Sequence, residues 1–202
     1  MSENLAYIES GIWIAKGIGE KDKFYLNSNI FINDNIETGK LKGIVSLISL
    51  MEAIDVIRAR ITSKTDRTIL NGMNEKRRVE YLKGHTDEKI RILLRYLRTK
   101  EAENKILFAD FTIVDLNKIY VNSFNYLRHY FGNIPFYYKC GKCWKDFPHY
   151  EYKGIGNIDV LHALLAKEYF CNLFITTDRD FRDLQGSPYF PDLQFEVISP
   201  TT

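Results

Sequence analysis

Two neighbouring segments decide the fold class: GNIDVLHALLA at residues 156–166, and LFITTDRDF at residues 173–181. Apolar residues at helical spacing predict a helix in the first segment, with Asn157 as its N-cap and Asp159 in its first turn. The second segment is a short apolar strand followed at once by Asp178. Because strand carboxyl ends and helix amino ends meet along one edge of an α/β sheet, we expect these acids to lie close together. Gathered carboxylates repel one another unless a cation neutralises them, so the two segments predict a divalent metal site.

The composition is that of an ordinary globular protein. The chain has 202 residues, of which 45% are hydrophobic and 27% are charged, enough for one domain with a substantial core. The polar residues 1–4 lack the pattern of a signal peptide, and no apolar run reaches the ~18 residues of a membrane span. The three cysteines do not suit the framework of a disulfide-rich secreted domain. We therefore expect a cytoplasmic protein that does not associate with a membrane.

Charge is distributed unevenly along the chain. The formal net charge is +2, but residues 58–105 carry 14 Lys or Arg against 7 Asp or Glu, which leaves the remainder net acidic. An acidic body with a basic middle suits a metal-dependent enzyme acting on a polyanion. The same pattern is also common in long charged helices that simply face solvent.

Strand-like and helix-like patterns alternate along the chain. Strands are expected at 5–8, 43–48 and 106–114, helices at 49–57, 62–103 (with breaks at Gly72 and Gly84) and 116–129, and a loop at 132–152. The alternation predicts an α/β fold with a mainly parallel sheet flanked by helices. We expect a single domain over 1–202, in which 62–153 contains an enlarged helical and aromatic insertion.

Four acids share one topological position, because each follows a strand or opens a helix. They are Glu9, Glu52, Asp159 and Asp178. Carboxylate ligands without His or Cys suit Mg²⁺ or Mn²⁺ far better than zinc. Asp180 is a candidate fifth ligand, although it can equally cap the turn before Phe181. For Glu52 the alternative is a capping box with Ser49, three residues earlier.

The order and spacing of these motifs resemble the PIN domain, a metal-dependent nuclease fold that includes the VapC-type toxins of toxin–antitoxin pairs. The matching segments are YIESGIWI (7–14), SLISLME (46–52), DVLHA (159–163) and TTDRDF (176–181). The resemblance covers roughly residues 5–61 and 154–199. It implies metal-dependent cleavage of RNA, metal ligation by the four acids named above, and an antitoxin protein as a partner.

The sequence departs from the family pattern in two ways. The first acid of the family is usually aspartate, whereas this chain has Glu9. A rival first motif around Asn27 lacks the acid and leaves too little chain before Glu52, so Glu9 is preferred. The separation between Glu52 and Asp159 is also much longer than in the compact toxins.

Substrate-binding candidates come from the basic stretch and from the terminal motif. Arg91, Arg95 and Arg98 share one helical face and can contact phosphates through their guanidinium groups. Thr177 is a candidate for orienting substrate or water, with capping as its alternative. A solvated helix face remains the alternative for the arginines. The expected partners are RNA, an antitoxin and a second copy of the chain.

The other motifs are weak. Cys140 and Cys143 have the spacing of half a zinc site, but no second Cys-x-x-Cys pair completes it, so zinc is not favoured. His162 lies one helical turn from Asp159 and is expected to be a packed core histidine rather than a substrate contact. Gly17 and Gly19 lack the third glycine of a dinucleotide fingerprint, and Walker and Gly-x-Ser-x-Gly motifs are absent.

Overall fold

The computed structural model describes residues 4–64, 67–109, 118, 121, 137–139, 150–152 and 156–201. Its centre is a five-stranded sheet in the order β3-β2-β1-β6-β7, and every neighbouring pair is parallel. The strands are β1 (Leu5–Ile8), β2 (Lys42–Ser46), β3 (Ile106–Ala109), β6 (Leu173–Thr176) and β7 (Gln194–Val197). The predicted α/β class with a parallel sheet flanked by helices is therefore confirmed.

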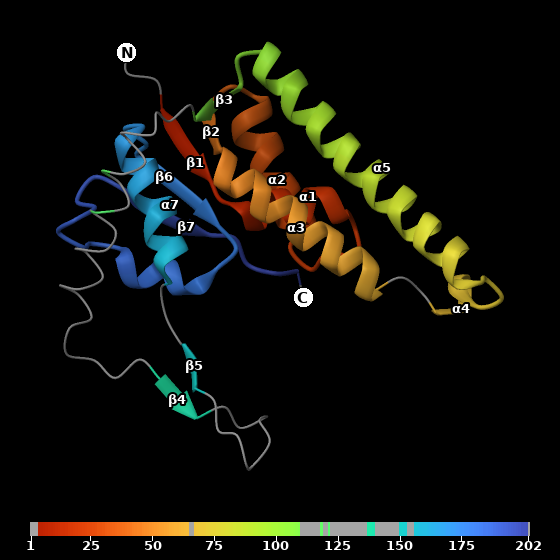
Figure 1. The fold of residues 1–202 in the computed structure, drawn as a ribbon. Helices are drawn as coiled ribbons and strands as arrows, with labels where there is room; N and C mark the ends of the chain where they lie inside the picture. Colours follow the sequence, from red (N-terminus) through yellow and green to blue (C-terminus); the bar gives the residue numbers. More distant parts are fainter. Residues whose placement is uncertain are drawn as a thin grey trace.

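Helices cover both faces of the sheet (Figure 1). One face carries α1 (Ser10–Ile18), α3 (Leu47–Lys64) and α5 (Glu75–Ala102), with α2 (Tyr25–Phe31) and the π-helix η1 (Ile32–Glu37) beside α1. The other face carries α7 (Asn157–Glu168) and the 3₁₀ helix η2 (Arg179–Leu184). Successive residues of β1 face opposite layers, because Ala6 and Ile8 join the first core cluster and Tyr7 joins the second. Burial on both faces explains why β1 is a continuous apolar run.

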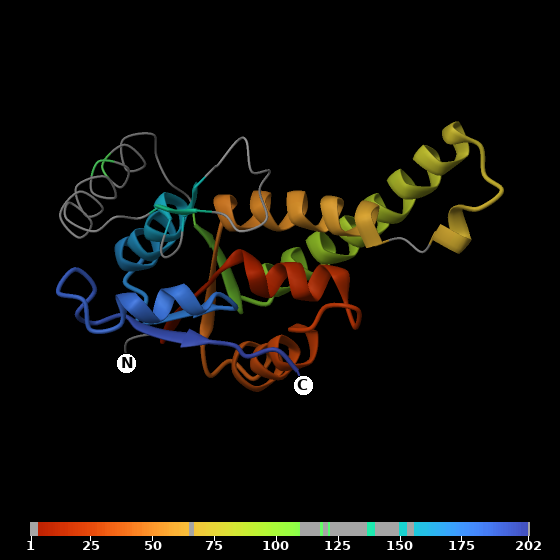
Figure 2. The same cartoon turned by 90° about the horizontal axis from the view of Figure 1, so that it is seen from below.

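The long helix α5 differs from the expectation for residues 62–103. It runs without interruption through Gly84, so the predicted break there is wrong. The cost of about 1 kcal/mol for a glycine inside a helix is small beside the burial of Ile90, Leu93 and Leu97 further along the same helix. The break at Gly72 is confirmed, with φ of 83° in the turn between α4 (Arg67–Leu70) and α5. Helices α4 and α5 extend beyond the sheet as an arm (Figure 2).

Other predicted boundaries shift or cannot be compared. The second strand ends at Ser46 rather than at 48, because α3 already begins at Leu47. The third strand is β3, and its predicted continuation from 110 lies outside the described residues, as does nearly all of the helix expected at 116–129. Within the expected loop at 132–152, β4 (Tyr137–Lys139) pairs antiparallel with β5 (Tyr150–Tyr152). None of the described helices is both long and apolar enough to span a lipid bilayer.

A polar network joins the end of η1 to the end of α5. The Glu37 carboxylate accepts hydrogen bonds from Tyr96 at 2.7 Å and from Lys105 at 3.2 Å, and it pairs with Lys100 at 2.9 Å. Burial alone would raise the pKa of Glu37, but the bonds from Lys100, Tyr96 and Lys105 lower it from 4.5 to about 2. The ionised form is thus favoured in the folded chain.

This network predicts a measurable acid sensitivity. A carboxyl group with a depressed pKa stabilises the fold above its unfolded pKa, and that contribution disappears as the pH falls towards the folded pKa. We expect Glu37→Gln to lower the free energy of unfolding at pH 6, and the difference from the wild type to shrink between pH 4.5 and pH 2. Urea unfolding of both proteins across this pH range measures it. A difference that stays constant with pH would contradict the ionic role of Glu37.

Candidate metal centre

The carboxyl ends of three adjacent strands bring the candidate residues to one edge of the sheet. Glu9 directly follows β1, Ser46 ends β2 and leads into α3 with Glu52, and Thr176 ends β6. The backbone N–H of Glu9 donates to the carbonyl of Ile175 at 2.9 Å, which joins the end of β1 to β6. Parallel pairing of these strands therefore places side chains far apart in sequence next to one another.

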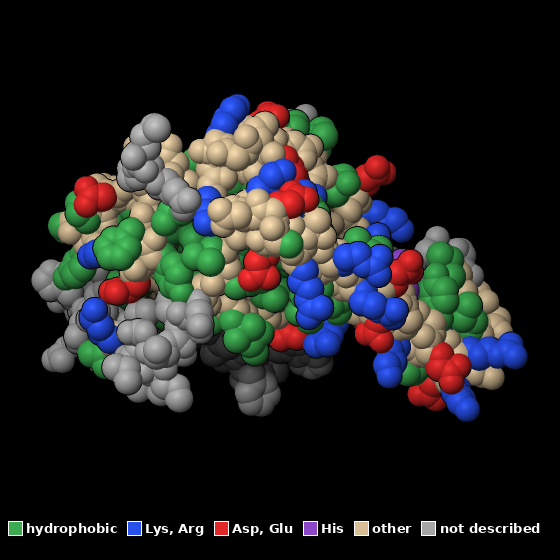
Figure 3. Space-filling model, turned by 90° about the horizontal axis from the view of Figure 1, so that it is seen from above, with side chains coloured by type: hydrophobic (Ala, Val, Ile, Leu, Met, Phe, Trp, Pro, Cys, Tyr) green, Lys and Arg blue, Asp and Glu red, His purple; other side chains and the backbone are tan. Residues whose placement is uncertain are grey.

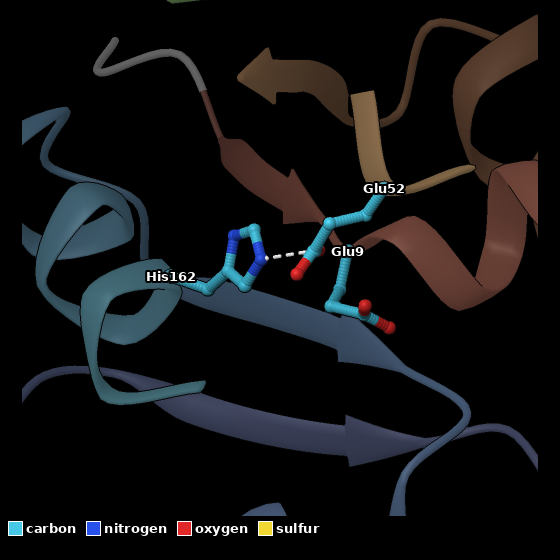
Figure 4. A group of neighbouring side chains, drawn as sticks. All are labelled: Glu9, Glu52 and His162. Atoms are coloured by element: carbon cyan, nitrogen blue, oxygen red, sulfur yellow. Dashed lines mark hydrogen bonds and ion pairs between the residues drawn. The ribbon is translucent and has the colours of Figure 1, made fainter. Parts of the chain in front are cut away.

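Glu9, Glu52 and His162 form a compact group at this edge (Figure 4). One ligand atom from each residue lies within 4.8 Å of the others. Glu9 and His162 are buried, whereas Glu52 is partly exposed. Two carboxylates and an imidazole at this separation are chemically suited to hold a divalent cation.

The Glu9 carboxylate is anchored at the start of α1. It caps the helix by accepting from the backbone N–H of Gly11 at 2.9 Å. It also accepts hydrogen bonds from the hydroxyl of Ser10 and, at 3.1 Å, from that of Thr176. A carboxylate has about four acceptor positions, so these three donors leave room for one further ligand.

Gly11 is the position where the backbone must approach this site closely. A Cβ there would collide with the Thr177 hydroxyl and would lie 2.9 Å from the Glu9 carboxylate. Thr177, a predicted substrate-binding residue, therefore lies directly beside the start of α1 and the anchored glutamate. Only a residue without a side chain fits between them.

Glu52 is held by His162 rather than by a helix cap. Its Oε2 lies 2.8 Å from His162 Nε2. The alternative of a capping box formed by Ser49 and Glu52 is wrong, because α3 begins two residues earlier and the hydroxyl of Ser46 accepts from the Ser49 backbone N–H at 3.0 Å. This cap leaves the Glu52 side chain to project towards α7.

His162 is buried, as expected of a packed histidine, but its ring is fully engaged at the site. Its Nδ1 lies 2.7 Å from the hydroxyl of Tyr7, which lies 2.6 Å from the hydroxyl of Ser46. The sequence signal for this role was the spacing of three residues between Asp159 and His162, which places both on one face of α7. The contacts with Tyr7 and Glu52 could not be inferred from that spacing.

Asp159 lies in the first turn of α7, as predicted, and its carboxylate accepts from the backbone N–H of Gly156 at 2.7 Å. The N-cap is Gly156, so the prediction of Asn157 as the cap is wrong by one residue. Burial raises the pKa of Asp159 to about 6; the Gly156 bond and His162 oppose this rise, while the negative charges of Asp178 and Glu9 add to it. A cation bound nearby would offset the repulsion that Asp159 experiences from Asp178 and Glu9, so the surroundings of Asp159 are chemically suited to a divalent metal.

Asp178 and Asp180 are exposed and belong to the turn after β6. Asp178 caps η2 by accepting from the backbone N–H of Asp180 at 2.9 Å, and its own N–H donates to the Thr176 hydroxyl at 2.9 Å. Among the described residues, neither they nor Asp159 belong to the compact group of three. The charge of Asp178 nevertheless acts on Asp159.

The predicted arginine face is separate from this group. Arg91, Arg95 and Arg98 are exposed on α5 and line a shallow groove of about 670 Å³. The end of α5 leads into the first residue of β3, so Arg98 lies towards the edge where the strands begin, opposite the edge that carries Glu9. Lys, Arg, Asp and Glu side chains alternate along this arm (Figure 3).

The cysteine prediction cannot be compared with the structure. Cys140 and Cys143 lie outside the described residues. Cys171 is buried, and burial raises the pKa of its thiol to about 12. A thiol with so high a pKa is a poor metal ligand at neutral pH.

No family model matches the chain, and no curated protein matches it. One similar solved structure is the crystal structure of VapBC2 from Rickettsia felis bound to a DNA fragment from their promoter, at 16% identity and a TM-score of 0.48 over 96% of this chain and 98% of that one. At 16% identity and a TM-score of 0.48, this likeness establishes neither a family nor a function for the chain.

Proposed function

We propose that this protein is a metal-dependent endoribonuclease that hydrolyses phosphodiester bonds in RNA. The observation that carries the proposal is the meeting of Glu9 and Glu52 at the edge where parallel strands end, with the charge of Glu9 also acting on Asp159. The order of these acids along the chain, which resembles that of PIN domains, supports it. Glu9, Glu52, Asp159 and Asp178 are the proposed ligands of Mg²⁺ or Mn²⁺, with Asp180 as a further candidate.

Backbone N–H groups and side chains around the acids hold three of them in place for this chemistry. Thr176 and the Gly11 N–H orient Glu9, the Gly156 N–H orients Asp159, and His162 orients Glu52. A bound Mg²⁺ or Mn²⁺ supplies Lewis-acid chemistry at the phosphodiester and lowers the pKa of the attacking water. In the proposal, Thr177 contacts the RNA beside the acids. Arg91, Arg95 and Arg98 contact a more distant part of the same RNA, because they lie on a separate face of the protein.

The test is Asp159→Asn in an RNA cleavage assay with Mn²⁺ at pH 8, where the aspartate is ionised. Asparagine keeps the oxygen that accepts from the Gly156 N–H, so the helix start is preserved while the charge is lost. We expect cleavage to be abolished in the variant, and EDTA to abolish it in the wild type. Asp192→Asn, at an exposed aspartate, is the matched control and should cleave normally. Equal cleavage by Asp159→Asn, or full activity in EDTA, would refute the mechanism.

The same resemblance supports a biological setting, in which the chain is the toxin of a toxin–antitoxin pair. Expression of the chain alone should then arrest growth, and co-expression of the gene immediately upstream should relieve the arrest. If the protein cleaves RNA in vitro but its expression does not arrest growth, the toxin role is refuted and the nuclease function still stands.

A second candidate is a non-catalytic PIN-like module that binds RNA or a protein partner. The observation in its favour is Glu9, because the carboxylate already serves as a helix cap with three donors. Calorimetry separates the two functions: an absence of heat with millimolar Mn²⁺ would favour the non-catalytic module.

A further inference from the structure

Both nitrogens of the buried His162 ring have polar partners, and one of these partners is a carboxylate of the candidate metal centre. Its Nε2 faces the Glu52 carboxylate at 2.8 Å, within the group that also contains Glu9. Its Nδ1 faces the Tyr7 hydroxyl at 2.7 Å. Both ring nitrogens are thus fixed, and only 1% of the residue is exposed to solvent.

The Tyr7 hydroxyl continues into a buried chain of hydroxyl groups. It lies 2.6 Å from the hydroxyl of Ser46 and 3.2 Å from that of Ser49, and these two serines are 3.1 Å apart. Each hydroxyl can donate or accept, so the hydrogen bonds along this row of hydroxyl groups can run in either direction. The direction of the hydrogen bonds among these hydroxyls decides which ring nitrogen of His162 carries the hydrogen.

The two directions have different consequences at Nε2. When Tyr7 donates to Nδ1, the hydrogen sits on Nε2 and is donated to Glu52. When Nδ1–H donates to Tyr7, which in turn donates to Ser46, Nε2 presents a lone pair towards the carboxylate. A lone pair facing a carboxylate oxygen at 2.8 Å is repulsive unless a cation accepts both.

The second direction matches the way proteins hold metal-binding histidines. Such a histidine donates its other ring N–H to a fixed acceptor, which sets the tautomer and the ring orientation. Here that acceptor is Tyr7, stacked on Phe174 at a centroid distance of 5.1 Å and buried in the second core cluster. The acceptor is therefore as rigid as the core itself.

We propose that His162 is a nitrogen ligand of the divalent site, with Glu9 and Glu52, and that the site consequently selects Mn²⁺ over Mg²⁺. Mn²⁺ is a first-row transition ion and accepts one nitrogen ligand beside carboxylates more readily than Mg²⁺, which takes oxygen ligands and gives up its waters reluctantly. This inference rests on the proposed metal-dependent function and adds a ligand that the four acids do not include.

The first experiment uses the wild-type protein loaded with Mn²⁺ and pulsed electron paramagnetic resonance. We expect a nitrogen coupling to the Mn²⁺ signal. We also expect calorimetry to show binding of Mn²⁺ that is tighter than that of Mg²⁺ by about tenfold or more, because Mg²⁺ prefers oxygen ligands. This readout needs neither a variant nor RNA cleavage. A Mn²⁺ signal without nitrogen coupling would overturn the inference.

Variants then identify the nitrogen. His162→Gln should remove the coupling and weaken Mn²⁺ binding by about tenfold or more, while His85→Gln on α5 should change neither. Tyr7→Phe keeps the ring packing but removes the acceptor of Nδ1, and it should weaken Mn²⁺ binding by about 10–100-fold. Unchanged Mn²⁺ affinity in a folded His162→Gln variant would overturn the inference.

The failure of this inference differs from that of the proposed function. If Mn²⁺ shows nitrogen coupling but the protein cleaves no RNA, the ligand role of His162 is supported and the nuclease function is refuted. If Mg²⁺ supports RNA cleavage as well as Mn²⁺ does, and Mn²⁺ shows no nitrogen coupling, the nuclease function is supported and the ligand role of His162 is refuted. Failure to bind Mn²⁺ at all would overturn both.

Discussion

Glu52→Gln is expected to eliminate Mn²⁺ binding at micromolar metal and to lower RNA cleavage at least about a hundredfold. Glutamine has the size of glutamate, and its amide can still pair with His162 Nε2 through its oxygen or its NH₂ group, whichever the histidine tautomer requires. The substitution therefore removes charge with little change in packing. A metal ion contributes several kcal/mol of charge stabilisation to the reaction, and a loss of about 3 kcal/mol corresponds to about a hundredfold in rate.

The measurements for Glu52→Gln are calorimetry with Mn²⁺ and a time course of RNA cleavage. Glu101→Gln is the matched control, because it makes the same change at an exposed position of α5. The control should bind Mn²⁺ and cleave RNA like the wild type. Wild-type affinity for Mn²⁺ in Glu52→Gln would exclude this residue as a ligand.

Much of the fold is predictable from local sequence. Strands β1 and β6 are apolar runs bounded by polar residues, and alternation of such runs with helices limits the arrangement to a parallel sheet. The expectation that Glu9 and Glu52 meet follows from parallel strands alone. The break wrongly placed at Gly84 shows the limit of local preference, because the buried face of a 28-residue helix outweighs one glycine.

The contacts of His162 could not be predicted from local sequence. Its two partners are separated from it by 110 and 155 residues, and neither makes a recognisable motif with it. An apolar helix containing one histidine most often buries it in the core. Burial does not conflict with the proposed ligand role of His162, because the buried Tyr7 hydroxyl beside Nδ1 fixes the orientation of the ring.

Glu9 illustrates how a capping residue and a candidate ligand can be the same group. Aspartate at a helix N-cap reaches the backbone N–H through a short side chain. Glutamate at this position also reaches the Gly11 N–H, and the hydroxyls of Ser10 and Thr176 complete its environment. The longer side chain is therefore accommodated by local donors, which keep the carboxylate at the edge of the sheet.

Phe174→Ala is expected to have the largest effect on stability, a loss of about 3–5 kcal/mol in the free energy of unfolding. Phe174 lies within β6 and is completely buried. Its ring stacks on Tyr7 at 5.1 Å and on Phe181 at 4.6 Å between centroids, and it contacts Phe195 at 5.3 Å. Alanine would leave a cavity among three aromatic rings that rigid strands and η2 hold in place.

Urea unfolding measures this loss, and Phe170→Ala provides the matched control. Phe170 is 87% exposed, so the same substitution there should change the free energy of unfolding by no more than about 0.5 kcal/mol. Because Tyr7 loses its stacking partner in Phe174→Ala, the hydroxyl that faces His162 should also become less fixed, and Mn²⁺ affinity should fall in the protein that remains folded. Equal losses of stability in the two variants would contradict the assigned core, whereas a loss of stability with unchanged Mn²⁺ affinity would separate the aromatic core from the metal centre.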